Sequence, residues 1–362
     1  MGQNKRELIQ AVFHNEKADR IPVGFWHHFL QDEVGADAFS HPQLTEKALE
    51  GQADFYQAFE PDMIKIMTDG FFGYPHPLLQ KAVESPKELM AITPLGRESE
   101  WFASQIRYAR KLVSIYGKET PLFYNLFAVP RTIEFMQTGI AHPVNLSDWL
   151  KQEPNKLAHV LDVISDDYAE LAKALVEEAK VDGIYLSVNN ISYDDVTEEA
   201  YRSIIAPYEQ KILEATNRAG GENILHICGY HGFHNHLSWY REYPFLAVNW
   251  AAKVEGVSLS EGKKLFQGKA VIDRYWLLVV WLQTTESPSL FLIKLMKGRR
   301  RNADEEKAAC QSPSQFIQFF CDQLAHSSSS FLSKTKSSRP IRDESRNFVF
   351  PPNFIHLSPS IP

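Results

Sequence analysis

The six residues ILHICG at positions 224–229 decide how this chain folds. They form a largely apolar run that ends in glycine, which is typical of a parallel strand buried on both faces. In such a strand, residues two positions apart point to the same side of the sheet. His226 and Cys228 are therefore expected to project together, into the interior or the mouth of a barrel.

Similar runs recur through the first 272 residues. Residues 155–180 and 197–218 lie between them and carry apolar residues at three- and four-residue spacings, which predicts helices. Pro207 predicts a kink or two helices in the second segment. Repeated strand–helix units indicate an α/β fold, either a closed parallel barrel or an open doubly wound sheet. The remaining strand-like runs are 20–26, 63–67, 121–129, 183–188, 245–250 and 269–272.

Composition and missing motifs narrow the class of protein. The net charge of −7 over 362 residues argues against nucleic acid as the main partner. No apolar run is long enough to span a bilayer, and residues 1–13 contain no signal-peptide core, so no membrane association is expected. Three cysteines are too few for a disulfide scaffold, which favours the cytoplasm. The glycine motifs of nucleotide-binding folds are absent, and this favours the barrel.

The region 273–362 differs in composition from the rest of the chain. Gly298 is its single glycine, basic residues outnumber acidic ones, and residues 327–330 are all serine. This composition predicts a poorly ordered or non-homologous tail, produced by a frameshift or fusion near Ile272 or by divergent extension. No eighth strand can be placed there convincingly. The barrel predicted over residues 1–272 is therefore expected to be incomplete or altered at its C-terminal end.

His226 and Cys228 carry the sharpest chemical signal. An imidazole and a thiolate at this spacing can bind one zinc ion, which accepts both nitrogen and sulfur. Zinc needs at least three protein donors, and Cys310 is one of only two other cysteines that could supply the third. The alternative is a buried cysteine that packs as a small hydrophobe beside a hydrogen-bonded histidine.

Asp69 is the candidate catalytic residue. It follows the run 63–67 directly, and in a barrel the catalytic groups gather at the C-terminal ends of the strands. A carboxylate there can bind substrate N–H groups or assist proton transfer. The alternative is an aspartate that forms a turn before Gly70.

Other polar side chains that follow strand-like runs are candidate substrate-binding residues. Asn189 and Asn190 can orient a polar ligand. His28 is predicted to face the mouth of the barrel, with an exposed surface histidine as the alternative. Asn125 lies in the third strand-like run, and Arg131 follows that run and can neutralise a substrate carboxylate.

Four segments together resemble the uroporphyrinogen-decarboxylase family, which includes cobalamin-dependent methyltransferases. They lie in the family's order over about residues 1–272, and the resemblance implies a TIM-type (β/α)8 barrel and strengthens the zinc hypothesis. The segments are Asp19-Arg20-Ile21-Pro22-Val23, the strand end at Asp69, Ala206-Pro207-Tyr208 and His226-Ile227-Cys228-Gly229.

The resemblance implies two alternative activities. The methyltransferase branch holds zinc with His-x-Cys and a later cysteine, a pattern that His226 and Cys228 match, and the metal activates a thiol that attacks a methyl group on a corrinoid. The decarboxylase branch needs no metal and binds a tetrapyrrole of porphyrin biosynthesis through an aspartate like Asp69 and through arginines after the first strand. Residues 26–31 contain no arginine, which counts against decarboxylation.

The sequence therefore predicts zinc-dependent methyl transfer from a corrinoid or a methylated substrate to a thiol. The expected partner is a small molecule or a corrinoid protein, and the sequence does not constrain the oligomeric state. Uroporphyrinogen decarboxylation is the first alternative. An inactive truncated barrel or a binding protein is the second, favoured by the composition of the tail.

Overall fold

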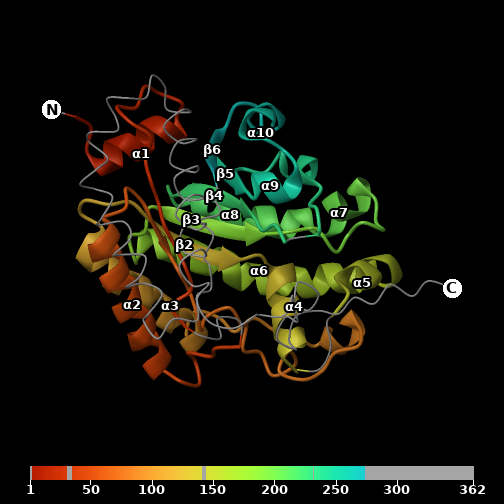
Figure 1. Cartoon of the computed structure of the whole chain (residues 1–362). Helices are drawn as coiled ribbons and strands as arrows, with labels where there is room; N and C mark the ends of the chain where they lie inside the picture. Colours follow the sequence, from red (N-terminus) through yellow and green to blue (C-terminus); the bar gives the residue numbers. More distant parts are fainter. Residues whose placement is uncertain (1, 31–34, 141–143, 231, 274–362) are drawn as a thin grey trace, which may run out of the picture. The chain divides into compact units, whose positions relative to one another are not determined.

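The computed structural model describes residues 2–30, 35–140, 144–230 and 232–273 (Figure 1). Within them, six strands form one parallel sheet whose spatial order follows the sequence. Gly24 adds a parallel bridge to Met63, just before the first of these strands. The strands are β1 (Ile64–Ile66), β2 (Leu122–Phe127), β3 (Gly183–Val188), β4 (Glu222–Ile227), β5 (Ala247–Trp250) and β6 (Ala270–Asp273).

Helices connect most of the successive strands, and between β4 and β5 the described residues form the 3-10 turn Leu237–Tyr240. Each crossover returns the chain to the next position along the sheet, whereas a doubly wound sheet reverses its order at a switch point. The α/β, TIM-type prediction is therefore confirmed. Six of the seven strand-like runs form strands of the sheet, and the run 20–26 contributes the isolated bridge at Gly24. The helices are α1 (Lys5–Phe13), α2 (Gln43–Phe59), α3 (Glu100–Tyr116), α4 (Val129–Ile140), α5 (Leu146–Gln152), α6 (Pro154–Glu177), α7 (Glu198–Ile204), α8 (Ala206–Arg218), α9 (Ala252–Glu255) and α10 (Leu259–Leu265), with 3-10 turns at Pro86–Leu89 and Leu237–Tyr240.

Local sequence accounts for these elements. Every residue of β3 is buried, as is nearly all of β2, because helices cover one side of the sheet and the barrel interior lies on the other. The predicted break at Pro207 is also confirmed. α7 ends at Ile204 and α8 begins at Ala206, which places the proline in the first turn, where its missing N–H costs no helical hydrogen bond.

The interior changes character along the strands. Ile9 and Phe13 of α1 pack against apolar residues near the strand starts, among them Phe123, Tyr185 and Ile224. In Figure 1, α1 accordingly lies at the end where the strands begin. Side chains two residues further along the same strands share this inner face. They are Asn125, Ser187, His226 and Asn249.

Several expectations concern residues 274–362, which lie outside the described ranges. These are the altered C-terminal end of the barrel, the tail that begins at 273, and Cys310. Among the helices in the described ranges, none combines the length and the apolar character needed to cross a membrane.

Candidate active site

A layer of polar side chains lines the inner face of the sheet, next to the apolar cluster that α1 closes. The Asn125 amide nitrogen donates to Thr68 Oγ1 at 3.3 Å, and Ser187 Oγ donates to Asn125 Oδ1 at 3.0 Å. His226 pairs in register with Ser187 on β3 and with Asn249 on β5. All five side chains are buried. The layer thus forms a polar floor across β2 to β5, below the C-terminal ends of the strands.

His226 lies on β4, and Cys228 follows directly after the strand. The His226 side chain is buried, its Nδ1 lies 2.5 Å from Asn249 Oδ1, and its ring centroid lies 5.6 Å from that of Tyr185. The Cys228 N–H donates to the Val188 carbonyl at 2.8 Å, so the β3–β4 ladder continues one residue past the strand. Side-chain alternation along this extended ladder predicts that Cys228 projects inward as His226 does.

Asn189 also lies at this level, one residue beyond β3. It is only 2% exposed, and among the described residues neither its amide nitrogen nor its amide oxygen has a hydrogen-bond partner. A buried polar group left unpaired costs roughly 1–3 kcal/mol. A ligand that offers a donor and an acceptor together would recover this cost.

Asn190 has a different role in the structure. Its side-chain oxygen accepts from the His236 N–H at 2.8 Å, and its own N–H donates to Asn235 Oδ1 at 2.8 Å. Asn235 in turn donates to the Cys228 carbonyl at 2.9 Å and to Glu255 at 2.7 Å. Asn190 is therefore one member of a clamp that joins the chain after β3, β4 and β5 and fixes the backbone at Cys228.

Asp69 and His28 form a pair at the end of β1. The fully buried Asp69 carboxylate accepts from His28 Nδ1 at 2.8 Å, from the Phe29 N–H at 2.5 Å and from the Leu30 N–H at 3.2 Å. The His28 side chain remains 40% exposed. Asp69 thus holds the segment 28–30, which follows the strand-like run 20–26, and orients an imidazole that solvent can reach.

Arg131 places a positive charge near Cys228. It lies in the first turn of α4 and forms an ion pair with Glu134, and both side chains are largely buried. Burial lowers the pKa of Arg131, but the nearby Glu134, Tyr230 and Cys228 raise it more, so the pKa stays above its usual value. Burial raises the pKa of Glu134. The guanidinium is therefore charged and lies within electrostatic range of the Cys228 sulfur.

The described residues offer two of the donors that the zinc hypothesis requires, His226 and Cys228. No group of three or more His, Cys, Asp or Glu side chains within these ranges is arranged to hold a metal ion. His226 and Cys228 are two donors of suitable types, and the hydrogen bond at His226 Nδ1 is the arrangement found at metal-binding histidines. A third donor has to come from elsewhere, and Cys310 lies outside the described ranges.

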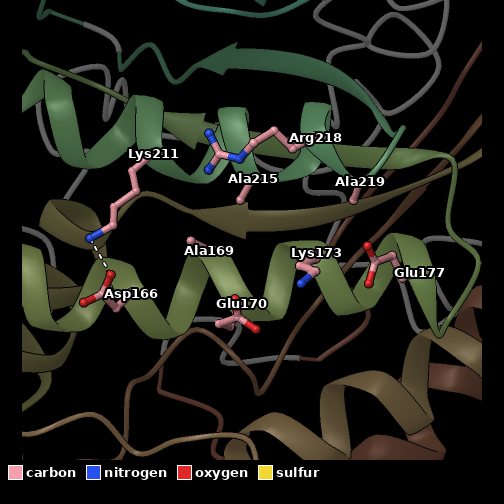
Figure 2. Close-up of a pocket in the computed structure, with 9 residues that line it drawn as sticks. All are labelled: Asp166, Ala169, Glu170, Lys173, Glu177, Lys211, Ala215, Arg218 and Ala219. Carbon is pink, nitrogen blue, oxygen red and sulfur yellow. Dashed lines mark ion pairs between the residues drawn. The ribbon is translucent and has the colours of Figure 1, made fainter.

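A groove of about 580 Å³ lies between α6 and α8 (Figure 2). Alanines such as Ala169 and Ala215 line it, and charges of both signs surround them, including the Lys211–Asp166 ion pair at 2.5 Å. The groove follows the C-terminal halves of these helices, which lie toward the starts of the strands. It contains none of the candidate site residues and is not the active site.

Sequence reasoning did not identify three residues of the site, which are Ser187, Asn235 and Asn249. Ser187 and Asn249 are polar residues inside otherwise apolar strands, at the same alternating positions as the inward-facing residues. That interruption is a usable signal, because a polar side chain inside a buried strand needs a partner or a function. Asn235 lies in a loop and gave no such signal.

The parallel sheet, whose strands follow one another in sequence order, defines a barrel of the TIM class. Its polar groups lie at the C-terminal ends of the strands, where enzymes of this class have their active sites. More narrowly, this chain belongs to the uroporphyrinogen decarboxylase (URO-D) family, whose model matches residues 4–272. The resemblance found in the sequence is thereby confirmed.

Two curated relatives are methylcobamide:CoM methyltransferases MtbA. The protein from Methanosarcina mazei is 24% identical over 155 residues, which cover 42% of this chain and 43% of the relative. The protein from Methanosarcina acetivorans is 29% identical over 117 residues, or 32% of each chain. This chain therefore spans less than half the length of the curated relatives that it matches.

A solved methyltransferase from Methanosarcina mazei has a similar fold. It superposes with a TM-score of 0.56 at 17% sequence identity and covers 75% of this chain and 82% of its own. At this identity the likeness establishes the shared fold.

Proposed function

We propose that this chain is a methyltransferase in which His226 and Cys228 hold a zinc ion and a thiol accepts the methyl group. The observation that carries the proposal is the buried His226 on β4 with its Nδ1 bonded to Asn249, and strand alternation is the argument that places Cys228 on the same face. The similarity to the MtbA proteins supports methyl transfer as the reaction. We propose a corrinoid or a methylated substrate as the donor, and the cytoplasm as the location.

The metal's third protein ligand is part of the same proposal. Cys310 is our candidate, because zinc needs at least three protein donors and the described residues supply two. When bound, zinc acts as a Lewis acid that favours the thiolate form of the acceptor. Metal binding requires the deprotonated sulfur of Cys228.

The chain's own residues would bind the substrates and move the proton. Asn189 would bind a polar group of a substrate, because both of its amide atoms are buried and unpartnered among the described residues. His28, oriented by Asp69 and still accessible, would accept the proton that the acceptor thiol loses. In this scheme Asp69 acts through His28, and Asn125 supports the polar floor below the substrate.

Metal analysis of the purified full chain tests the proposal directly. We expect stoichiometric zinc in the wild-type protein, its loss in Cys228→Ala, and strong weakening in Cys310→Ser. Cys321→Ser is the matched control, since it removes a thiol that the proposal does not use, and should keep its zinc. Methyl transfer from methylcobalamin to a thiol by metal-free protein would refute the proposal.

Decarboxylation of a tetrapyrrole is the second candidate. The family match and the buried Asp69 at a strand end favour it. Two observations count against it. Residues 26–31 contain no arginine that could pair with a polycarboxylate, and Arg20 forms an ion pair with Asp62 at 2.5 Å. Turnover of uroporphyrinogen by the metal-free chain would establish this activity. Absence of both activities would favour an inactive barrel or a binding protein.

A further inference from the structure

We infer that Asn249 is a positioning residue that holds His226 in the tautomer with the proton on Nδ1 and the lone pair on Nε2. The inference rests on the proposed function, in which the inward-facing imidazole is a metal ligand. It adds the residue that makes this histidine competent to bind the metal and the reason why the residue is an asparagine.

The orientation of the Asn249 amide follows from its bond to β6. Asn249 is fully buried on β5, and its amide nitrogen donates to the Ile272 carbonyl at 2.9 Å. A carbonyl oxygen can only accept, so the nitrogen of this amide has to face β6. The amide oxygen consequently faces β4 and His226.

The tautomer of His226 follows from this orientation. His226 Nδ1 lies 2.5 Å from Asn249 Oδ1, and an amide oxygen cannot donate. Nδ1 therefore carries the proton, and in the neutral ring the lone pair resides on Nε2. The opposite tautomer would place an N–H at Nε2 and would leave two acceptors, Nδ1 and Oδ1, facing each other.

The ring is also restrained from the other side. Its centroid lies 5.6 Å from that of Tyr185 on β3, in a tilted arrangement. The imidazole is thus confined between side chains of β3 and β5, while the Ile272 backbone on β6 fixes the amide. Four neighbouring strands together determine which nitrogen can bind a metal. Asparagine suits this position because its amide oxygen is a fixed acceptor and, unlike a carboxylate, adds no negative charge to the buried layer.

Two variants separate the hydrogen bond from packing. Asn249→Leu keeps a similar volume and removes the acceptor, whereas Asn249→Asp keeps an acceptor toward His226. Asn223→Leu is the control, because Asn223 is an equally buried asparagine that lies on the opposite face of β4 and donates to the Leu213 carbonyl at 2.8 Å. It should destabilise the protein without changing His226.

The experiment measures the nitrogen-15 shifts of His226 in the metal-free full chain, at a pH where imidazoles are neutral. His226→Gln identifies the signals. We expect the Nδ1–H tautomer in the wild type, in Asn249→Asp and in Asn223→Leu, and a substantial Nε2–H population in Asn249→Leu. Zinc dissociation constants, measured by competition with a chelator, should rise about 10- to 100-fold in Asn249→Leu alone.

Specific results would overturn the inference. An Nε2–H tautomer in the wild type would do so, as would an Asn249→Leu variant with unchanged shifts. If Asn249→Leu does not fold, Asn249→Ala, which also removes the acceptor, takes its place in the same measurement. A shift of tautomer in a protein that never binds zinc would uphold the role of Asn249 and refute the proposed function.

Discussion

The two ends of the barrel interior use the same inner face of the same strands for opposite purposes. Near the strand starts this face carries apolar side chains, such as Phe123 and Ile224, that pack against α1. Two residues further along it carries Asn125, Ser187 and His226. A shift of two residues along each strand therefore separates two regions. The first stabilises the fold, whereas the second carries buried polar groups that cost stability unless they are paired.

The two ends also differ in how their connections are fixed. The N-terminal helix α1 is held by burial of Ile9 and Phe13, and also by polar contacts of Arg6 with Asp182 and with the Gly117 carbonyl. The segments at the other end are held by hydrogen bonds that backbone N–H groups donate to side-chain oxygens, such as those of Asp69 and Asn190. Such bonds set positions without filling volume, which suits a site that has to admit substrates. Substitutions at the two ends should consequently change different properties.

The largest expected effect is on catalysis at the polar end. His28→Gln should lower the rate of methyl transfer by about 10²- to 10⁴-fold, the usual contribution of a group that handles a proton. Its stability should change little, because the ring is 40% exposed. Steady-state kinetics and urea unfolding of the same preparation measure both quantities. A rate within twofold of the wild type would remove His28 from the mechanism.

At the apolar end the effect should fall on stability. Phe13→Ala removes a side chain that is 3% exposed and should lower the free energy of unfolding by about 3–5 kcal/mol. The rate per folded molecule should be unchanged. Phe233→Ala is the control, since Phe233 is 44% exposed and should cost little. If Phe13→Ala lost more activity than its loss of folded protein explains, the apolar end would also affect catalysis.

A third region, behind the polar end, should make stability depend on pH. Burial raises the pKa of Glu209 to about 7, although hydrogen bonds from Tyr243 and Tyr201 lower it. The folded state then binds more protons than the unfolded state between the ordinary carboxyl pKa and about 7. Stability should therefore fall across this interval as the pH rises, by about 3 kcal/mol, and then level off. Glu209→Gln should abolish this component in urea titrations at several pH values, and an unchanged slope would contradict it.

Much of this arrangement could be predicted from the sequence, for local reasons. The strand positions follow from runs of apolar residues, and the common side of His226 and Cys228 follows from strand alternation. The partners of these residues could not be predicted. The contact of His226 with Asn249 depends on how β4 and β5 align, and the contact of Asp69 with His28 joins segments 41 residues apart. Such contacts depend on how distant segments pair. The spacing of apolar residues along the sequence carries no information about that pairing.

The smallest expected effect is the most informative about the site, because stability and function should move in opposite directions. Asn189→Leu replaces an amide that has no hydrogen-bond partner among the described residues by an apolar side chain of similar size. It should raise the free energy of unfolding by about 1–3 kcal/mol, since a desolvated donor and acceptor are removed. The same change should raise KM, because a substrate would lose its partner. Asn190→Leu is the matched comparison and should destabilise the protein, since that side chain is bonded to the His236 backbone. Chemical unfolding and KM measurements on both variants decide the matter, and a destabilised Asn189→Leu protein with an unaltered KM would show that this amide serves the fold and not the substrate.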